Sequence, residues 1–390
     1  MSEASTLALL ERLVAFDTVS RNSNLPLIEF VRSYLDGLGV TSRLVHDATG
    51  TKANLFATIG PADRPGVILS GHTDVVPVDG QAWDTDPFAL TARDGRLYGR
   101  GSCDMKGFDA VILALVPEMM RAKLRRPIHL ALSYDEEVGC QGVRTLITAL
   151  EQDGLRPWAC FVGEPTEMGV VIGHKGKRSL RATVTGRECH SSLAPRGVNA
   201  VEYAARLVVF ISDIGRAFQE SGARDALYDI PHTTAHAGVS HGGTVVNIVP
   251  NRAEVVFEFR HLPGDDIDDL VGRVRRFAAD TLEPAMQEVA PETGIVFEEI
   301  ATLPPLATEP EAPVVTLAKQ LSRNNAHGKV AFGTEGGIFQ SRLGVPTVVC
   351  GPGNIEQAHK PNEFIERSQL EACEGFVRRL IDHLASDQAA

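Results

Sequence analysis

The sequence has few cysteines, no excess of positive charge and no long apolar run, and each absence excludes a class of protein. Its six cysteines show no C-x-x-C spacing and no dense framework, so we expect reduced thiols in a cytoplasmic protein rather than a disulfide scaffold. With 38 basic and 50 acidic residues, the formal net charge is −12. That balance argues against a surface that binds nucleic acid or an anionic membrane.

No stretch of the sequence has the composition of a secretory signal or a membrane span. Residues Met1-Ser2-Glu3-Ala4 include no basic side chain, and Glu11 and Arg12 interrupt the apolar residues that follow. No uninterrupted apolar run is long enough to cross a bilayer. We therefore expect no signal peptide, no membrane partner and no nucleic-acid partner.

What is present is the composition and length of a soluble protein with more than one domain. Hydrophobic residues make up 43% of the chain and charged residues 23%, which are ordinary values for a globular protein. A chain of 390 residues exceeds the size at which a single hydrophobic core stops growing. Two domains are therefore expected.

The N-terminal part alternates between predicted helices and strands. Helical spacing covers 5–17, 24–39, 108–123 and 141–152, and runs typical of strands cover 40–45, 54–59, 67–69, 128–134 and 159–162. This alternation indicates an α/β sheet with helices on both faces. The segment 75–107 is rich in Asp, Pro and Gly, and loops of this length are usually functional.

The pattern changes around Lys175-Gly176-Lys177. Strands are predicted at 179–185, 233–239, 253–261 and 295–300, and helices at 198–211 and 267–281. The order β-α-β-β-α-β is typical of a ferredoxin-like sandwich, here an inserted domain of normal size. The α/β pattern then resumes with helices at 311–323 and from about 368, and strands at 329–332 and 347–351.

Potential metal ligands follow directly on the predicted central strands. Histidines or glutamates stand after four strands, and an aspartate stands where the long loop meets a helix: His72, Asp104, Glu136, Glu137, Glu164 and His359. Ligands bind outside the carboxyl ends of strands in open α/β sheets, so these side chains converge if the strands are neighbours. Asp74 can orient the imidazole of His72, because residues two apart in extended chain face the same way.

The chemistry of this set favours divalent ions of the Zn, Co or Mn type. Two histidines and several carboxylates without a thiolate pair differ from a structural zinc finger. The set is large enough for two metal ions about 3.5–4 Å apart, the spacing of hydrolytic two-metal sites. Side chains of adjacent residues diverge, so we expect one of Glu136 and Glu137 to act as a base and the other as a ligand.

These residues stand in motifs that resemble the M20 metallopeptidases and deacylases. The motifs are Ser70-Gly71-His72-Thr73-Asp74-Val75-Val76-Pro77, Gly99-Arg100-Gly101-Ser102-Cys103-Asp104-Met105-Lys106-Gly107, Asp135-Glu136-Glu137-Val138-Gly139, Gly163-Glu164-Pro165-Thr166 and Gln357-Ala358-His359-Lys360-Pro361-Asn362-Glu363. They span essentially the whole chain in the family's order. The resemblance implies a mixed-sheet metallopeptidase catalytic domain with helices on both faces, formed by 1–176 and 291–390. It also implies an inserted α+β ferredoxin-like lid at 177–290 that mediates homodimerisation.

Carried over position by position, the resemblance implies two divalent metal ions, Zn²⁺ or Co²⁺. One would be held by His72, Asp104 and Glu164. The other would be held by Glu137, His359 and the bridging Asp104.

The resemblance also implies roles for three residues outside the ligand set. Glu136 would be the general base that deprotonates the attacking water, and Asp74 would orient His72. His190, in Gly186-Arg187-Glu188-Cys189-His190-Ser191-Ser192, would donate to the oxyanion in the active site of the other subunit. Such donors act where charge develops only in the transition state.

Within the family, three segments resemble the acetylornithine deacetylases. They are Gln357–Phe364 after Gly351-Pro352-Gly353, Asp79-Gly80-Gln81-Ala82-Trp83 and Gly333-Thr334-Glu335. The resemblance implies hydrolysis of an N²-acetyl amide to acetate and ornithine, a step of arginine biosynthesis.

Four further residues would then bind this small N-acyl amino acid. Asn247 and Arg260 would hold the substrate α-carboxylate, for which the arginine fork is suited. Thr334 would add a hydroxyl donor. Glu335 would face either the side-chain ammonium or the protein core.

Other classes of function remain open at this point. Gly238-Val239-Ser240-His241-Gly242 matches the nucleophile elbow of serine hydrolases, but that motif needs a following helix, and Thr244–Val249 is typical of a strand. His232 and His236 have metal-ligand spacing without the glutamate of zincins. A non-catalytic binding protein on the same fold is a third class. Within the enzymes, the alternatives are acetylcitrulline deacetylase, succinyl-diaminopimelate desuccinylase and a metal-dependent dipeptidase or carboxypeptidase.

Overall fold

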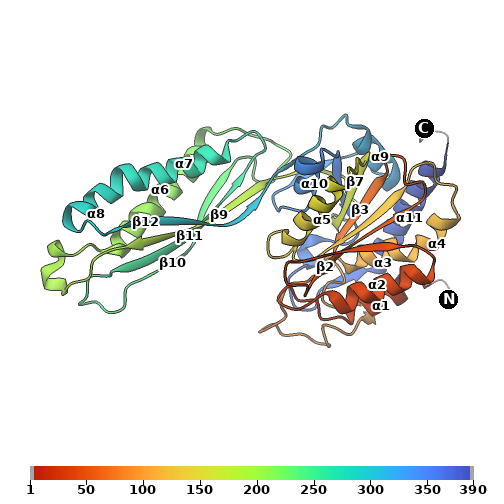
Figure 1. Ribbon diagram of the computed structural model, residues 1–390, viewed down its shortest axis with the longest axis horizontal. Helices are drawn as coiled ribbons and strands as arrows, with labels where there is room; N and C mark the ends of the chain where they lie inside the picture. Colours follow the sequence, from red (N-terminus) through yellow and green to blue (C-terminus); the bar gives the residue numbers. More distant parts are fainter. Residues whose placement is uncertain (1–3, 387–390) are drawn as a thin grey trace. The chain divides into compact units, whose positions relative to one another are not determined.

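The computed structural model describes residues 4–386, so Met1–Glu3, which bear on the expected lack of a signal peptide, lie outside the described residues. The chain divides into two compact units (Figure 1). The first contains the chain up to His174, Leu306–Lys329 and the segment from Thr334 onward, and the second contains Lys175–Pro305 with Val330–Gly333. Every helix within 4–386 is too short or too polar to reach across a lipid bilayer.

A mixed sheet forms the centre of the first unit. Its strands run in the order β1-β2-β6-β3-β7-β15-β8-β13, with β14 paired to β8. They are β1 (Ser42–His46), β2 (Ala53–Ile59), β3 (Val67–His72), β6 (Ile128–Ser133), β7 (Ala159–Pro165), β8 (Val171–His174), β13 (Leu306–Ala307), β14 (Gly328–Val330) and β15 (Thr347–Gly351). β3 is parallel to β6 and β7, and β15 is parallel to β7. These four strands are buried along their whole length, as expected where both faces are covered.

Helices cover both faces of this sheet. One face packs against a large apolar core shared by α1 (Thr6–Val14), α2 (Leu25–Gly37), α3 (Lys106–Ala114), α4 (Val116–Arg121), α9 (Pro313–Ser322) and α11 (Arg367–Ala385). The other face carries α5 (Gln141–Gln152) and α10 (Gly336–Leu343). A small sheet of β4 (Thr91–Arg93), β5 (Arg96–Tyr98) and β16 (Phe364–Glu366) completes the unit, together with the short turn η3 (Ile355–Gln357). The expected α/β class with helices on both faces is confirmed.

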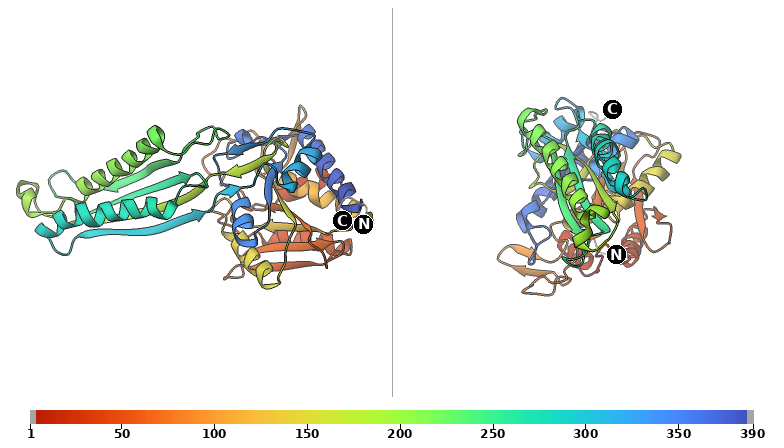
Figure 2. Two further views of the ribbon diagram at one scale, coloured as in Figure 1. Left: turned by 90° about the horizontal axis from the view of Figure 1, so that it is seen from above. Right: turned by 90° about the vertical axis from the view of Figure 1, so that its left-hand side faces the viewer.

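The second unit is a four-stranded antiparallel sheet with helices on one face. Its order is β10-β11-β9-β12, from β9 (Gly176–Thr185), β10 (Thr234–Gly242), β11 (Arg252–His261) and β12 (Gly294–Leu303). Helices α6 (Ala200–Ser221), α7 (Ile267–Phe277) and α8 (Glu283–Val289) share its apolar core, with η2 (Ala278–Leu282) between the last two, and η1 (Ser191–Arg196) precedes α6 (Figure 2). Burial alternates along β11, because one sheet face meets the helices and the other does not. The chain order is the expected β-α-β-β-α-β.

Several boundaries differ from the sequence prediction. The helix expected at 108–123 divides at Leu115 into α3 and α4, because Pro117 suits the first turn of a new helix. The segment 75–107, expected to be a loop, contains the β4–β5 hairpin. The second unit extends to Pro305 rather than 290, because β12 pairs with β9 in its sheet.

Candidate metal centre

Four central strands bring the candidate ligands to one edge of the sheet. β3 ends in His72, β6 is followed by Glu136 and Glu137, β7 contains Glu164, and β15 precedes the loop that carries His359. Because β3 is parallel to β6 and β7, and β7 to β15, the carboxyl ends of all four strands point the same way. Convergence of residues that are far apart in sequence therefore follows from the topology.

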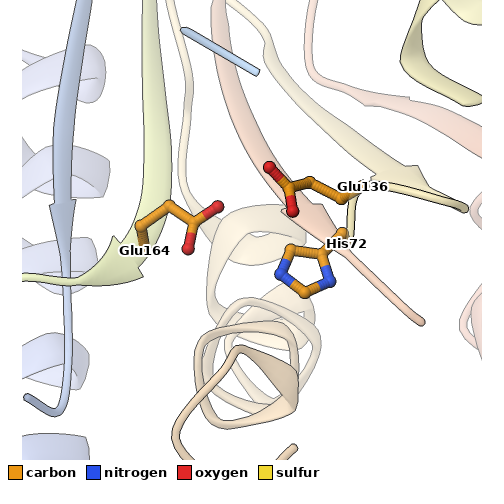
Figure 3. Close-up of side chains that lie close together, drawn as sticks. All are labelled: His72, Glu136 and Glu164. Atoms are coloured by element: carbon orange, nitrogen blue, oxygen red, sulfur yellow. The ribbon is translucent and has the colours of Figure 1, made fainter. Parts of the chain in front are cut away.

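The side chains of this edge form one continuous cluster. His72 Nε2 lies 3.0 Å from Asp104 Oδ1, and His359 Nε2 lies 3.3 Å from Asp104 Oδ2 and 3.1 Å from Glu137 Oε2. In each of two groups, His72 with Glu136 and Glu164, and His72 with Asp104 and Glu137, the ligand atoms lie within 4.8 Å of one another. Figure 3 shows the side chains of the first group facing a common space. The structure thus brings together all six residues that the sequence proposed as metal ligands or base.

The electrostatics of the cluster call for a cation. Burial raises the pKa of Glu136 to about 8 and that of Glu164 well above its ordinary value, and neighbouring carboxylates add to both shifts. Hydrogen bonds to Asp104 and Glu137 raise the pKa of His359 to about 10. A bound divalent cation would relieve the repulsion among these four carboxylates. Imidazole nitrogens with carboxylate oxygens also match the ligands that Zn²⁺ and Co²⁺ accept, so the residues present fit such an ion.

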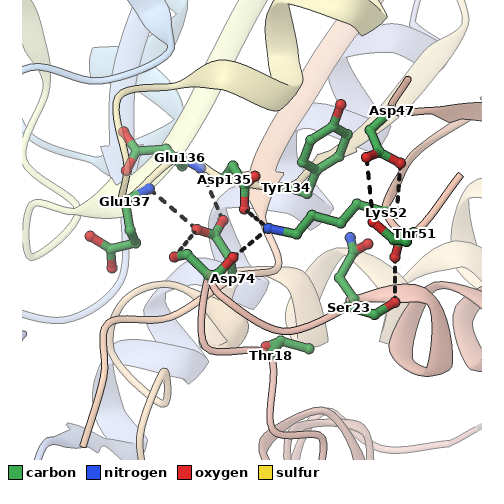
Figure 4. A network of polar contacts seen from close by, with 12 residues as sticks. Thr18, Ser23, Asp47, Thr51, Lys52, Asp74, Tyr134, Asp135, Glu136 and Glu137 are labelled. Carbon is green, nitrogen blue, oxygen red and sulfur yellow. Dashed lines mark hydrogen bonds and ion pairs between the residues drawn. The ribbon is translucent and has the colours of Figure 1, made fainter. Parts of the chain in front are cut away.

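Asp74 supports this cluster in two ways. His72 Nδ1 lies 2.9 Å from the backbone oxygen of Asp74 and 3.6 Å from its Oδ1, so Nδ1 carries the proton and Nε2 is directed toward Asp104. The Asp74 carboxylate also accepts the backbone N–H groups of Glu136 and Glu137 at 3.0 and 3.3 Å (Figure 4). The sequence predicted the contact with His72 but not the contacts with the glutamate backbone.

Comparison with known proteins identifies the family. The model of peptidase family M20/M25/M40 matches residues 68–383. The chain belongs to this family. Acetylornithine deacetylase of Photorhabdus laumondii is 33% identical over 385 residues, covering 97% of this chain and 96% of that protein. Acetylornithine deacetylase of Myxococcus xanthus is 34% identical over 391 residues, covering 96% of both.

Solved structures of two peptidases share the fold of the whole chain. A tripeptidase from Staphylococcus aureus has a TM-score of 0.75 at 21% identity, with 99% of both chains covered. The M20 family metallo-carboxypeptidase Sso-CP2 from Sulfolobus solfataricus has a TM-score of 0.76 at 19% identity, covering 98% of this chain and 99% of that one. Family membership and the curated relatives together make this M20 chain a metal-dependent amide hydrolase.

Glu363 is a buried residue of this M20 chain that the sequence analysis did not single out. Its carboxylate accepts hydrogen bonds from Arg100 Nη1 at 2.7 Å and from the backbone N–H groups of Gly101, Cys103 and Asp104 at 2.9–3.0 Å. It thereby ties the loop of Asp104 to the loop of His359. The signal in the sequence was its place in the last of the five motifs, four positions after His359.

Cys140 is a second neighbour that the sequence analysis did not find. Its thiol lies 3.1 Å from Glu136 Oε1 and donates to that carboxylate, and its backbone N–H donates to the Glu136 carbonyl oxygen at 2.8 Å. Both the backbone and the side chain of Cys140 therefore contact Glu136, and they hold the turn between the two residues. A lone cysteine at the start of a predicted helix carries no sequence signal for this contact.

The structure places Thr334 and Glu335 in the interior of the first unit. Glu335 is 1% exposed and accepts hydrogen bonds from Ser70 Oγ at 3.1 Å and from Ser133 Oγ. Burial raises the pKa of Glu335 to about 7. Thr334 is also buried, and its hydroxyl accepts the N–H of Gly336 at 3.1 Å at the start of α10. For Glu335 this is the core position, the second of the two that the sequence left open.

The candidate substrate residues of the second unit do not lie together. The loops of His190 and Asn247 are adjacent, since the Ser191 N–H donates to the Asn247 carbonyl oxygen at 3.0 Å. Asn247 precedes the start of β11 at Arg252, whereas Arg260 lies near the end of that strand. Arg252 and Arg260 are eight residues apart along this strand, which at about 3.3 Å per residue is roughly 26 Å.

Two alternative motifs of the second unit have the wrong surroundings. Gly238–Gly242 lies within β10, which leads into a loop and not into the helix that a nucleophile elbow requires. His232 contacts Arg224 through Nδ1 at 3.2 Å, and neither it nor His236 belongs to a group with metal-ligand spacing among residues 4–386. Neither motif supports a second catalytic site.

Proposed function

We propose that this M20 enzyme removes the acetyl group from N²-acetyl-L-ornithine to give L-ornithine and acetate, a step of arginine biosynthesis. The observation that carries the chemistry is the position of Glu136 within the cluster of His72, Asp104, Glu137, Glu164 and His359. The choice of substrate rests on curated relatives named acetylornithine deacetylase, which are 31–34% identical over nearly the full chain. A cytoplasmic location stays a prediction from the sequence.

The proposal includes two divalent metal ions, Zn²⁺ or Co²⁺. His72, Asp104 and Glu164 would hold one, and Glu137, His359 and the shared Asp104 would hold the other. Bound there, such ions polarise a carbonyl oxygen and lower the pKa of water. The proximity of the imidazoles to Asp104 and Glu137 supports this assignment.

Glu136 is proposed as the general base. Its carboxylate would accept a proton from the attacking water and return it to the nitrogen of the leaving amine, so that the amide C–N bond breaks and a C–O bond forms. A carboxylate oxygen of Glu136 lies within 4.8 Å of ligand atoms of His72 and Glu164, so the proposed base is next to the proposed metal site. Asp74 would orient His72 and fix the backbone of the two glutamates.

His190 is proposed to donate a hydrogen bond to the developing oxyanion of a partner subunit. Its side chain is exposed, and its Nδ1 lies 2.8 Å from Ser192 Oγ, which leaves Nε2 as the nitrogen for such a donor.

Arg260 and Asn247 are proposed to bind the substrate α-carboxylate. The separation of roughly 26 Å along β11 supports a homodimer in which the two copies supply these residues to one substrate. In this proposal the second unit is the lid and dimerisation domain.

A comparison of substrates tests the assignment. Steady-state kcat/KM would be measured on acetylornithine, acetylcitrulline, succinyl-diaminopimelate and a dipeptide, with enzyme loaded with Zn²⁺ or Co²⁺. We expect the highest kcat/KM with acetylornithine. A higher value with acetylcitrulline, succinyl-diaminopimelate or the dipeptide would assign the chain to that branch of the family. Metal binding without hydrolysis of any N-acyl amino acid or peptide would contradict the enzymatic function itself.

A further inference from the structure

The side chain of Lys52 connects the segments of Ser20 and Asp135, which lie close to the cluster of candidate metal ligands. Lys52 lies at the end of the turn between β1 and β2, and its side chain is 15% exposed. Its Nζ lies 2.5 Å from Asp135 Oδ1 (Figure 4). The same Nζ also donates to the backbone oxygen of Ser20. The carboxylate of Asp47 accepts the backbone N–H of Lys52 at 2.9 Å and so holds the turn in place. One ammonium group thus joins a carboxylate and a carbonyl from distant parts of the sequence.

Further hydrogen bonds complete a closed ring of contacts that includes the backbone of the proposed base, Glu136, and of its neighbour, Glu137. Ser20 Oγ donates to Asp74 Oδ2 at 2.7 Å. The Asp74 carboxylate accepts the N–H groups of Glu136 and Glu137, which directly follow Asp135. From Lys52 the ring therefore runs through Ser20 and Asp74 to the glutamate backbone, and returns through Asp135.

The backbone of Asp135 depends on such support. Its φ angle is +54°, in the left-handed region that non-glycine residues occupy only when the surroundings hold them there. Without the ammonium group, the Asp135 carboxylate would lose its ion pair and the Ser20 backbone oxygen would lose a hydrogen-bond donor.

We propose that Lys52 is a positioning residue, which fixes Asp135 and thereby aims Glu136 and Glu137 at the metal cluster. This inference rests on the proposed function for the role of Glu136 as base, but the metal-binding role of Glu137 does not depend on the substrate. Lys52 touches neither the reacting atoms nor the ligands. Its loss should therefore act on kcat and on metal affinity, and leave KM for the substrate unchanged.

The test compares Lys52→Met with Lys52→Arg and with Lys123→Met. Lys123 is exposed, so its variant removes the same charge away from the ring. We expect Lys52→Met to lower kcat and the affinity for Zn²⁺, measured by calorimetry on the metal-free enzyme, about 10- to 100-fold each. Lys52→Arg should restore most of both, because the guanidinium can donate to Asp135 and to the Ser20 oxygen. Lys123→Met should behave as the wild type.

Asp135→Asn provides an independent second variant. It should reproduce the losses in kcat and Zn²⁺ affinity, and the double variant Lys52→Met/Asp135→Asn should lose less than the two single variants combined. Wild-type kcat and Zn²⁺ affinity in Lys52→Met would overturn the proposal. If Lys52→Met does not fold, as judged by circular dichroism and urea unfolding, then unchanged values in Asp135→Asn would overturn it. A wild-type enzyme that binds Zn²⁺ but does not hydrolyse acetylornithine would contradict the proposed function only, since the Zn²⁺ affinities still decide the role of Lys52.

Discussion

The two units of the chain hold their candidate functional residues in opposite ways. In the first unit, the ligand cluster comes from four neighbouring strand ends, and His72, Asp104 and Glu164 are at most 5% exposed. In the second unit, His190 and Asn247 are exposed on loops, and Arg260 lies at the far end of a strand. The first arrangement is set by sheet topology and buried hydrogen bonds. The second is dispersed over loops and the far end of a strand, and the proposed homodimer is what would bring its residues to one substrate.

The largest expected effect tests whether the general base and the metal ligands of the first unit are different residues. Glu136→Gln should lower kcat about 100- to 10,000-fold and leave Zn²⁺ binding intact, because it removes a proton acceptor and not a metal ligand. The measurements are single-turnover kinetics and calorimetric titration with Zn²⁺. Glu164→Gln is the matched control and should lose affinity for the metal. Weakened Zn²⁺ binding in Glu136→Gln would instead make Glu136 a ligand, which its place beside His72 and Glu164 also permits.

The next effect concerns the second unit. His190→Ala should lower kcat about 100- to 1,000-fold, because it removes a donor to the oxyanion. Its position can be decided by refolding an equal mixture of the His190→Ala and Glu136→Gln chains. If His190 acts on a partner subunit, mixed dimers contain one complete site, and about a quarter of wild-type activity per chain should return. No recovery, with mixed dimers demonstrated by differently tagged chains, would place His190 and Glu136 in the site of one copy.

A smaller effect is expected at Asp74, where the first unit supports its ligands. Asp74→Ala should weaken Zn²⁺ binding and activity about 10- to 100-fold, and His72→Ala should cost more. The loss has two sources in the structure, the orientation of His72 and the N–H groups of Glu136 and Glu137. Asp79→Ala serves as the control, because Asp79 is 64% exposed and pairs with Arg21. An unchanged Zn²⁺ affinity in Asp74→Ala would show that the backbone oxygen alone orients His72.

The same difference between the units explains how much could be predicted from the sequence. Apolar runs followed by His72, Glu136, Glu164 and His359 place these residues at strand ends, and parallel strands then bring them together without further information. Residues that act through buried contacts carry no such local signal. Glu363 is 259 positions from Asp104, whose N–H it accepts, and Lys52 is 83 positions from Asp135.

Secondary structure was missed where tertiary contacts decide it. The helix α10 begins with Gly336 and Gly337, two residues with low helix propensity, and is held by packing on β7 and β15. The short strand β13 has only two residues and exists through its pairing with β8. In the second unit, single residues could be assigned by resemblance, but their separation along β11 appeared only with the register of the strands.

The smallest expected effect concerns Glu335, a residue of the first unit that takes no direct part in the proposed reaction. Its pKa is raised by burial from 4.5 to about 7, so the unfolded chain loses this proton at lower pH than the folded one. The free energy of unfolding should therefore fall as pH rises through this interval, because ionisation favours the unfolded chain. Between pH 5 and pH 8 the metal-free wild type should lose about 2–3 kcal/mol more than Glu335→Gln, as measured by urea unfolding.

Kinetics on the same variant test the core position that the structure gives Glu335. A glutamate held by Ser70 and Ser133 in the core should leave the ratio of KM values for acetylornithine and acetylmethionine unchanged when replaced by Gln. A glutamate that faces the substrate ammonium should raise KM for acetylornithine alone, because acetylmethionine carries no such charge. An equal pH dependence of stability in both proteins, with a selective rise in KM for acetylornithine, would move Glu335 from the supporting interior of the first unit to its substrate pocket. The first unit would then also hold a residue that binds the substrate side chain, so the difference between the two units would be smaller.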